Sequence, residues 1–324
     1  MVAVVGNRHR SGCEPLSPAE YFAALAPAPL QSLSLPVFDR AGLDVRVLRD
    51  DLRAPLLAGN KARKLEHNLL AAAAQGARTL VSMGGPHSNH LHALAMAGSQ
   101  FGFATAAWVR AEPDLPLTPT LRDCQAAGMR LQRLSRQAFR ERRAQPVPDL
   151  SAFAAPYWLP EGGSNALAIP GVAAALQTPA LADFAPDLVL CAAGTGATAA
   201  GLAAGLATLQ EHGEVWAVAV LKGGSFLLRD GKSLLAAAGC RQRRPLRVLT
   251  AFHFGGYGRC PTELQLFCRQ FCADTGVPVE PIYTGRVCYA LVELARRGVF
   301  RRGSRILLVH TGGMQGARAS LPPA

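Results

Sequence analysis

Short apolar runs alternate with segments of helical character along most of this 324-residue chain. Val45–Leu48, Thr79–Met83 and Thr105–Val109 have the length and composition of strands, whereas residues 61–75 and 118–128 are predicted helices. Strands and helices that alternate in this way form parallel sheets covered by helices on both faces. The pattern therefore predicts an α/β fold, and the chain length is typical of about two domains.

The same alternation returns in the second half of the chain. Strands are expected at Asp187–Cys191, Glu214–Leu221 and Arg305–His310, with a glycine-rich turn and a helix between the first two. The uncharged stretch Leu188–Gln210 is long enough to span a membrane, but it starts as a strand and four glycines interrupt it. We therefore expect a buried strand, turn and helix there, and no membrane span.

Two segments lack a clear period. The Pro- and Ala-rich stretch that runs to about Pro36 is expected to follow the surface. The Arg- and Pro-rich segment Arg140–Pro160 is expected to cross from one domain to the other.

Arginine supplies most of the positive charge, and the net charge of +12 invites a nucleic-acid interpretation. Only four of the 34 basic residues are lysines: Lys61, Lys64, Lys222 and Lys232. The densest arginine run, Arg130–Arg143, has roughly helical spacing and predicts a solvated helix face. No basic arm, aromatic platform or known motif accompanies it, so we exclude nucleic-acid binding as the main function.

The cysteines and the N-terminal residues bear on the compartment. Eight cysteines are too few and too scattered for a disulfide framework. The first residues do not combine a basic segment with an apolar one, so they do not resemble a secretory signal. Both observations predict a cytoplasmic protein.

Two of the four lysines lie three residues apart in the motif G-N-K-A-R-K-L-E, residues 59–66, at the start of a predicted helix. An amine that loses its proton and attacks a carbonyl carbon has to be a lysine, because the guanidinium group of arginine stays charged. A helix N-terminus and a second cation both lower a lysine pKa, which suits a Schiff base. A surface helix that happens to keep its lysines explains the local pattern equally well.

The motif G-G-P-H-S-N-H, residues 84–90, follows a strand and opens a helix. Small residues let the backbone approach a ligand, and the first amides of a helix bind anions such as a carboxylate. An ordinary helix cap at Ser88 is the simpler interpretation. His87, His90 and His92 lack the spacing of known metal-binding motifs, so we predict no metal site.

A glycine-rich turn, G-T-G-A-T at residues 194–198, lies between a predicted strand and a predicted helix. Backbone amides and two hydroxyl groups at a helix N-terminus can hold a phosphate. Extended to Ala199, the turn also fits the G-x-G-x-x-A pattern of dinucleotide-binding proteins. The next strand ends in Lys222 and not in the carboxylate that binds a ribose, so this match is weak.

Taken in order, the motifs resemble pyridoxal-phosphate (PLP) enzymes of the tryptophan-synthase β fold, in the branch of 1-aminocyclopropane-1-carboxylate deaminase and D-cysteine desulfhydrase. The likeness starts at Arg49-Asp50-Asp51-Leu52 and covers most of the chain after residue 45. It continues through the motifs at residues 59–66, 84–90, 162–165 (G-G-S-N), 194–198, 254–258 (F-G-G-Y-G), 283–286 (Y-T-G-R) and 310–313 (H-T-G-G). The first two of these motifs are specific, and the glycine-rich ones are not.

The resemblance implies two three-layer α/β/α domains with mostly parallel sheets and with PLP in the cleft between them. We place the smaller, inserted domain at residues 59–163, where it carries Lys61 and the Ser88-Asn89 loop. Residues 1–58 and 164–324 would form the larger PLP-binding domain. Members of this family are commonly homodimers, so the resemblance also implies a homodimer.

The resemblance further assigns the cofactor contacts. Lys61 would be the Schiff-base lysine, Asn89 would bond the 3′-oxygen of the cofactor, and Thr284 would face its pyridine nitrogen. Lys64 would help to hold the phosphate group. The remaining phosphate contacts would come from the turn made of Gly194, Thr195, Gly196, Ala197 and Thr198.

On the substrate side, Ser88 and the amides around it would bind the carboxylate, and Tyr257 and Tyr283 would flank the reacting amino acid. Thr284 and Thr311 match the desulfhydrase, because the deaminase has a glutamate and a leucine at these two positions. A hydroxyl group stabilises a pyridinium less than a carboxylate does. Expelling a good β-leaving group needs less electron withdrawal than opening a cyclopropane ring.

Two residues depart from the branch. His87 takes the place of the usual glutamine beside Ser88, and it could change the substrate size or supply an acid. Arg286 takes the place of a common lysine. We expect Arg286 to be a surface exchange of the kind seen along the whole chain.

The sequence thus predicts a PLP-dependent lyase that acts on a small amino acid by Cα deprotonation and β-elimination, with D-cysteine giving pyruvate, sulfide and ammonia. The first alternative is 1-aminocyclopropane-1-carboxylate deamination to 2-oxobutyrate and ammonia, against which Thr284 and Thr311 count. An NADP-dependent oxidoreductase leaves the motif around Lys61 unexplained. A catalytically inactive PLP-binding protein is the third alternative, and His87 is the feature that favours it.

Overall fold

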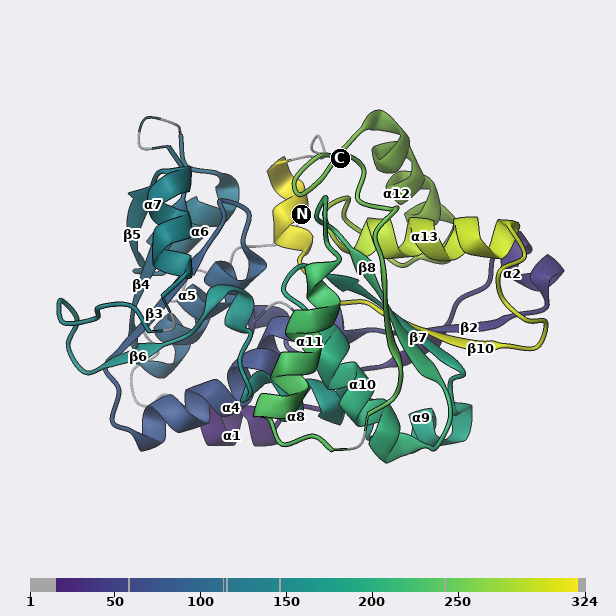
Figure 1. Ribbon diagram of the computed structural model, residues 1–324, viewed down its shortest axis with the longest axis horizontal. Coiled ribbons are helices and arrows are strands. Elements are labelled where there is room, and N and C mark those ends of the chain that lie inside the picture. Colours follow the sequence, from purple (N-terminus) through teal and green to yellow (C-terminus); the bar gives the residue numbers. More distant parts are fainter. Residues whose placement is uncertain are drawn as a thin grey trace.

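The computed structural model describes residues 16–319, apart from residues 58, 113, 115, 146 and 242. Its elements form two sheets that lie side by side in Figure 1, each flanked by helices. Neighbouring parallel strands are connected through helices, as the alternation in the sequence predicts. The α/β fold with two mostly parallel sheets is therefore confirmed.

The larger sheet has six strands. Their order across the sheet is β1 (Leu30–Ser32), β2 (Asp44–Leu48), β10 (Arg305–Val309), β7 (Leu188–Ala193), β8 (Glu214–Ala219) and β9 (Leu246–Leu249). All neighbouring pairs are parallel, except that β1 runs antiparallel to β2. Strand β7 is central and buried along its whole length, which explains its continuous apolar sequence.

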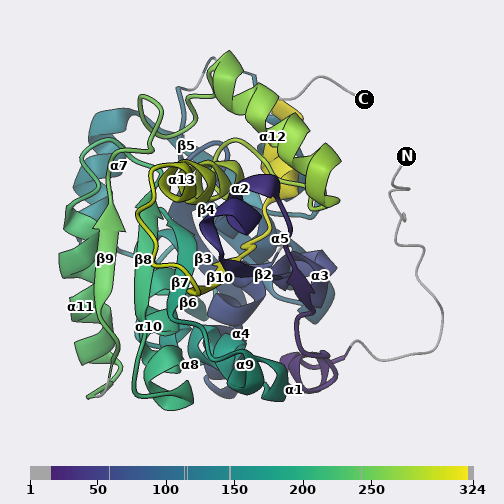
Figure 2. The same cartoon turned by 90° about the vertical axis from the view of Figure 1, so that its right-hand side faces the viewer.

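Helices cover both faces of the larger sheet, as Figure 2 shows. One face packs against α2 (Pro36–Ala41), α12 (Thr262–Thr275) and α13 (Thr284–Arg296). The other face packs against α8 (Ala168–Ala173), α9 (Pro179–Phe184), α10 (Ala197–Leu209) and α11 (Phe226–Ala237). We call each sheet with its helices a half of the molecule. Short helical segments complete the larger half: α3 (Asp50–Arg53), η3 (Ala174–Leu176) and η4 (Met314–Ala319).

The smaller sheet has four strands, and all of its neighbouring pairs are parallel. Their order is β5 (Arg130–Leu134), β4 (Ala104–Arg110), β3 (Thr79–Gly84) and β6 (Pro156–Trp158). One face is covered by α4 (Asn60–Ala74), α5 (Asn89–Phe101) and α6 (Pro119–Ala126). Helix α7 (Arg136–Arg143) covers the other face through Phe139, and η2 (Glu161–Gly163) follows β6.

One sequence prediction fails in this sheet, and one strand is present that was not predicted. The run Arg130–Arg143 is not one helix face: residues 130–134 form β5, and a new helix begins after Ser135, whose hydroxyl group caps α7. The segment Arg140–Pro160, which is expected to cross between domains, contains the strand β6, and this strand pairs with β3. Both missed strands are short edge strands with little buried surface, so they lack the apolar alternation that marks a half-buried strand.

The segment before residue 36 also differs from expectation. Residues 1–15 lie outside the described residues, but α1 (Pro18–Ala23) does not merely follow the surface. Phe22 is buried in the core of the smaller sheet, together with Leu57 of η1 (Pro55–Leu57) and Leu65 of α4. The boundaries at residues 59 and 163 remain a prediction, and this packing shows that earlier residues share the core of the smaller sheet.

The uncharged stretch Leu188–Gln210 folds as strand β7, a turn and helix α10, as the sequence predicts. Both elements are buried between the layers of the larger half. Within the described ranges, no helix is long and apolar enough to cross a membrane.

Glycines let α8 lie very close to two other helices. A Cβ at Gly205 of α10 would collide with the carbonyl oxygen of Ala173 in α8. A Cβ at Gly171 of α8 would collide with the carbonyl oxygen of Arg63 in α4. Helix α8 therefore fixes the separation of α4 and α10, and both of these helices begin at the same cavity.

We expect Gly205→Ala to destabilise the protein by about 1–3 kcal/mol, because the added methyl group meets a backbone atom that cannot rotate away. At most helix positions the same change stabilises by roughly 0.5–1 kcal/mol. Gly231→Ala in α11 is the matched control, since its nearest contact is the flexible end of Leu246. Urea unfolding of the two variants and the parent protein measures both effects; equal midpoints for both variants would contradict the close packing.

Candidate active site

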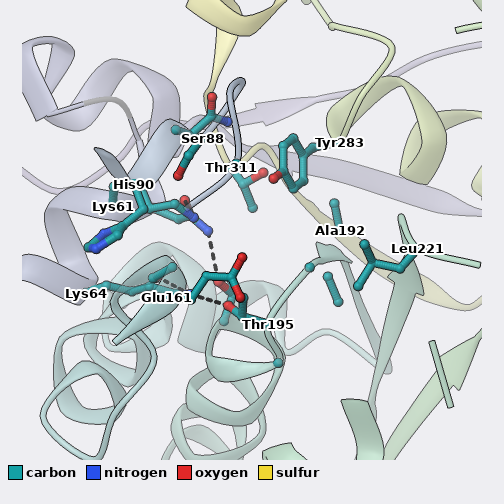
Figure 3. Close-up of a pocket in the computed structure, with 18 of the residues that line it drawn as sticks. Lys61, Lys64, Ser88, His90, Glu161, Ala192, Thr195, Leu221, Tyr283 and Thr311 are labelled. Atoms are coloured by element: carbon teal, nitrogen blue, oxygen red, sulfur yellow. Dashed lines mark hydrogen bonds between the residues drawn. The ribbon is translucent and has the colours of Figure 1, made fainter. Parts of the chain in front are cut away.

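A cavity lies between the two sheets, at the loops that follow the carboxyl ends of their strands (Figure 3). Loops in this position are the usual ligand-binding segments of parallel α/β sheets. The smaller half contributes Lys61, Lys64, Ser88 and Asn89. The larger half contributes Gly194, Thr195, Gly196, Thr198, Tyr257, Tyr283 and Thr311. Two of the residues expected in the site, Ala197 and Thr284, are buried at the starts of α10 and α13 and do not line the cavity.

Lys61 lies in the first turn of α4 and faces the cavity. Its Nζ donates a hydrogen bond to Oδ1 of Asn60 at 3.2 Å. No carboxylate among the described residues lies within ion-pair distance of this amine. Burial away from water lowers the pKa of Lys61 to about 8. A substantial fraction of this amine is therefore neutral and nucleophilic near physiological pH.

Lys64 lies one turn further along α4 and is almost completely buried. Its Nζ donates to the carbonyl oxygen of Gly162 at 3.2 Å, to Oγ of Ser164 at 3.3 Å and to Oγ1 of Thr195 at 3.4 Å. Burial and the nearby Lys61 hold the pKa of Lys64 well below its usual range. The described residues offer no carboxylate to this amine, so a negatively charged ligand in the cavity would stabilise its protonated form.

The glycine-rich turn before α10 is shaped to receive that anion. Gly196 caps α10 in a left-handed conformation with φ of 85°, which directs the first amides of a thirteen-residue helix at the cavity. Thr195 shares a 2.6 Å hydrogen bond with Ser164. Thr198 accepts a 2.8 Å hydrogen bond from the side-chain amide of Asn60. Polar groups from both halves therefore converge on one end of the cavity.

The loop after β3 supplies a helix cap as well as cavity residues. Oγ of Ser88 accepts a hydrogen bond from the backbone N–H of Leu91 at 3.2 Å, so the simpler interpretation of Ser88 as a cap is correct. The same residue also lines the cavity. Oδ1 of Asn89 accepts a 2.9 Å hydrogen bond from Nε2 of Gln315 in η4. A Cβ at Gly313 would collide with the Asn89 amide, so this glycine makes room for that side chain.

His90 has a role that the sequence analysis did not assign. Its Nε2 lies 2.9 Å from Oγ of Ser82, and that hydroxyl group donates to the carbonyl oxygen of Leu159 at 2.8 Å. Ser82 therefore accepts from Nε2, which leaves Nδ1 of His90 as a buried acceptor without a hydrogen-bond partner. Burial and the two nearby lysines hold the pKa of His90 well below its usual range, so the ring is neutral. Across residues 16–319 with their gaps, no three His, Cys, Asp or Glu side chains cluster in a way that could hold a metal.

Two tyrosines of the larger half also line the cavity. The hydroxyl group of Tyr283 donates to that of Tyr257 at 3.3 Å, and Tyr257 donates to the carbonyl oxygen of His87 at 3.2 Å. Burial raises the pKa of Tyr257 to about 12 and that of Tyr283 well above its usual value. Both phenols therefore keep their protons at neutral pH and can act as hydrogen-bond donors.

Thr284 is held by an acid that the sequence analysis missed. Glu280 is fully buried, and its carboxylate accepts hydrogen bonds from the backbone N–H groups of Ile282, Tyr283 and Thr284. The Thr284 hydroxyl group donates to Oε1 of Glu280 at 3.2 Å and accepts from the Glu280 N–H at 2.9 Å. Burial raises the pKa of Glu280. Glu280 stands directly before the motif at residues 281–286, and an acidic side chain in that position is the signal that could have drawn attention to it.

The prediction that Arg286 is a surface exchange is wrong, because this side chain is completely buried. Each of its five N–H donors meets a backbone carbonyl oxygen, at 2.6 to 3.0 Å: those of Pro281, Val220, His253, Gly256 and Arg259. The last three acceptors belong to the loop that carries Tyr257. Arginine is needed here because lysine has only three donors, all on one nitrogen atom, and cannot reach the same five carbonyl oxygens.

We expect Arg286→Lys to lower stability by at least about 1–3 kcal/mol, since two carbonyl groups lose their donors in a buried site. The Tyr257 loop should loosen, and the variant should lose turnover as well. Arg296→Lys, on the exposed side of the same helix, is the matched control and should unfold like the parent protein. Thermal unfolding measures the difference. A normal melting temperature for Arg286→Lys would show that the five bonds do not stabilise the loop.

Comparison with known proteins agrees with this geometry. The family model described as "Pyridoxal-phosphate dependent enzyme" matches residues 22–312. A protein of Pyrococcus horikoshii that is provisionally named 1-aminocyclopropane-1-carboxylate deaminase is 30% identical over 281 residues, which cover 85% of this chain and 86% of that protein. A D-cysteine desulfhydrase of Klebsiella pneumoniae (strain 342) is 28% identical over 306 residues, covering 89% and 92%. The crystal structure of an ACC deaminase homologue is similar with a TM-score of 0.76 at 27% identity, covering 93% and 95%.

The chain is therefore a member of the PLP-dependent enzymes, whose family model spans almost all of the described residues. Within this class it belongs to the family of 1-aminocyclopropane-1-carboxylate deaminase and D-cysteine desulfhydrase, with the tryptophan-synthase β-like fold. The family resemblance and the fold expected from it are confirmed. The residues of the cavity fit PLP, because a buried Lys64 without a carboxylate partner lies beside a helix N-terminus that suits a phosphate.

Proposed function

We propose that this protein is a lyase that removes the Cα proton of a small amino acid and expels its β-substituent, with D-cysteine as substrate. The observation that carries the proposal is the depressed pKa of Lys61, about 8, in a cavity that the protonated Tyr257 and Tyr283 also line. This arrangement places a base and two acids around one small space. Thr284 and Thr311 favour the desulfhydrase over the deaminase.

In this proposal Lys61 would hold the cofactor covalently, and Asn89 would bond its 3′-oxygen. Lys64 and the turn Gly194–Thr198 would hold its phosphate group. When bound, PLP supplies an electron sink for the electron pair that remains when the Cα–H bond breaks. Ser88 and the nearby N–H groups of α5 bind the substrate carboxylate, as the first amides of a helix do for anions.

The protein residues then move protons. Once the substrate amino group has taken its place, the released, neutral Lys61 takes the Cα proton at its Nζ. The Cβ–S bond breaks, sulfide leaves with the electron pair, and a phenol of the Tyr257–Tyr283 pair donates a proton toward it. Water hydrolyses the remaining three-carbon fragment, so that D-cysteine and water become pyruvate, hydrogen sulfide and ammonia.

The second candidate is deamination of 1-aminocyclopropane-1-carboxylate to 2-oxobutyrate and ammonia. The names of several relatives with 28–30% identity favour it. Supplying D-cysteine, L-cysteine and 1-aminocyclopropane-1-carboxylate separately to the PLP-loaded protein separates the two. Pyruvate and sulfide from D-cysteine are expected; 2-oxobutyrate from the cyclopropane would make the deaminase correct, and no product from any of the three would contradict both. An NADP-dependent oxidoreductase does not account for the family match, and a yellow but inactive protein would indicate the PLP-binding alternative.

We expect Lys61→Arg to reduce turnover of D-cysteine by at least about 10³-fold, because the guanidinium group neither attacks a carbonyl carbon nor accepts the Cα proton. The cofactor should still bind without a covalent bond. Lys232→Arg is the matched control, since this lysine is exposed on α11. Pyruvate release reports activity, and borohydride reduction with peptide mass spectrometry reports the attachment point. Normal activity in Lys61→Arg would refute the role of Lys61.

The pKa of Lys61 also predicts a pH dependence. Covalent attachment of PLP to the cofactor-free protein requires the neutral amine, so the rate should rise about tenfold per pH unit below pH 8 and level off above it. An exposed lysine, with its pKa near 10.4, would keep rising across this range. Stopped-flow absorbance from pH 6.5 to 9.5 follows the reaction. A rate that still rises steeply at pH 9.5 would show that burial does not depress this pKa.

A further inference from the structure

A second hollow opens beside the active-site cavity, and its lining is rich in arginine. It is lined by the loop after β3, the end of β4, β5 and α7. Arg110 and Arg143 line both this hollow and the cavity that holds Lys61, so the two spaces adjoin at these side chains. The volume of the hollow, about 690 Å³, leaves room for a substituent larger than a thiol.

The charge in this hollow is one-sided. Its basic lining residues are Arg110, Arg133, Arg136, Arg140 and Arg143, and Glu112 is the acidic residue that lines it. We call the space that these five side chains line the arginine hollow. The five side chains come from β4, β5 and α7, so the fold gathers here the run that sequence spacing assigned to a solvated helix face.

Few acidic groups balance these arginines. Arg143 forms an ion pair with Glu161 at 3.0 Å, and Nη1 of Arg133 donates to the backbone oxygen of Glu112 at 3.4 Å. Arg110, Arg136 and Arg140 have no carboxylate within ion-pair distance in the described part of the chain. Several positive charges around one hollow make its electrostatic potential positive, and a positive potential attracts an anion.

His87 adds an independent observation. It lines the arginine hollow, and its Nδ1 is buried without a hydrogen-bond partner. Its backbone oxygen accepts the hydrogen bond of Tyr257, and the next residue is Ser88. The residue that departs from the family pattern therefore connects the hollow with the wall of the active site. A proton on Nδ1 would make this ring a donor to an anion in the hollow.

We propose that the arginine hollow binds a negatively charged group at the far end of the amino-acid substrate, such as a carboxylate or a phosphate. This inference rests on the proposed lyase and extends its substrates from a small thiol to anionic β-substituents. With an O-phosphoserine, the Cα proton goes to Lys61 and the Cβ–O bond breaks. Phosphate leaves with the electron pair, and water completes pyruvate and ammonia from the remainder.

Matched pairs of amino acids test the hollow in the PLP-loaded protein. The pairs are aspartate with asparagine and glutamate with glutamine, each as both enantiomers, and binding is followed by the visible absorption of the cofactor. In at least one pair, the acidic member should bind at least tenfold more tightly than its amide. The double variant Arg136→Gln/Arg140→Gln should reduce that ratio to about one, because both side chains line only the second hollow.

Arg229→Gln on α11 is the control, since this arginine is exposed and lines neither space. It should keep the parent ratio. Should the double variant melt early, Arg140→Gln alone replaces it, and the ratio should fall by several fold. Equal binding of acid and amide by the parent protein would overturn the proposed role of the arginine hollow. An unchanged acid-to-amide affinity ratio in the double variant would overturn it as well.

Turnover separates the two proposals. Release of pyruvate and phosphate from an O-phosphoserine, faster than pyruvate release from the matching serine, supports both the lyase and the hollow. Pyruvate from D-cysteine without any preference for acidic partners overturns the hollow and leaves the lyase intact. A protein that carries PLP but neither binds nor converts any of these amino acids overturns both.

Discussion

The cleft depends on two buried amines that lie one helical turn apart and have no carboxylate beside them. A buried cation without a counter-ion is costly, and two such groups repel each other. The fold partly offsets this cost at Lys64, whose three acceptors come from η2, the residue after it and the turn before α10. The amine therefore connects the smaller half to the larger one, and the remaining imbalance favours an anionic cofactor. Lys61, with one amide oxygen as its partner, is left free for chemistry.

Two further buried charged side chains shape the wall that carries the two tyrosines. Glu280 gathers the first amides of α13, and Arg286 gathers five carbonyl oxygens, three of them from the loop of Tyr257. Each satisfies backbone groups that would otherwise be buried without partners, which is costly in a loop that enters the protein interior. The two phenols are thus positioned by backbone contacts that leave their hydroxyl groups at the cavity. The hydrogen bonds of Glu280 and Arg286 therefore hold this wall of the cavity in place.

Much of this arrangement could be predicted from the sequence, because the spacing of apolar residues and the position of a motif between a strand and a helix are local properties of the chain. The buried strands β3 and β7 and the helices after them lie within a few residues of their predicted bounds. The edge strands β5 and β6 were missed because a short strand with little buried surface carries no apolar period. Arg286 was misassigned because arginine replaces lysine along this whole chain, so composition hid a residue four of whose five acceptors lie 27 to 66 positions away in the sequence. Glu280 was missed although its partners lie only two to four residues further along the chain. His90 was missed because Ser82 becomes its partner only through the turn after β3.

The contact between Asn89 and Gln315 has a consequence for the order of events during synthesis. These residues are 226 positions apart in the chain, and η4 reaches back from the end of the larger half to the start of α5. The β3–α5 unit emerges from the ribosome long before its partner, so its side-chain amide waits without this hydrogen bond while the larger sheet is made. Strand β10, which completes the middle of that sheet, emerges just before η4. The cavity therefore cannot be complete before strand β10 and η4, the last elements of the described chain, have been made.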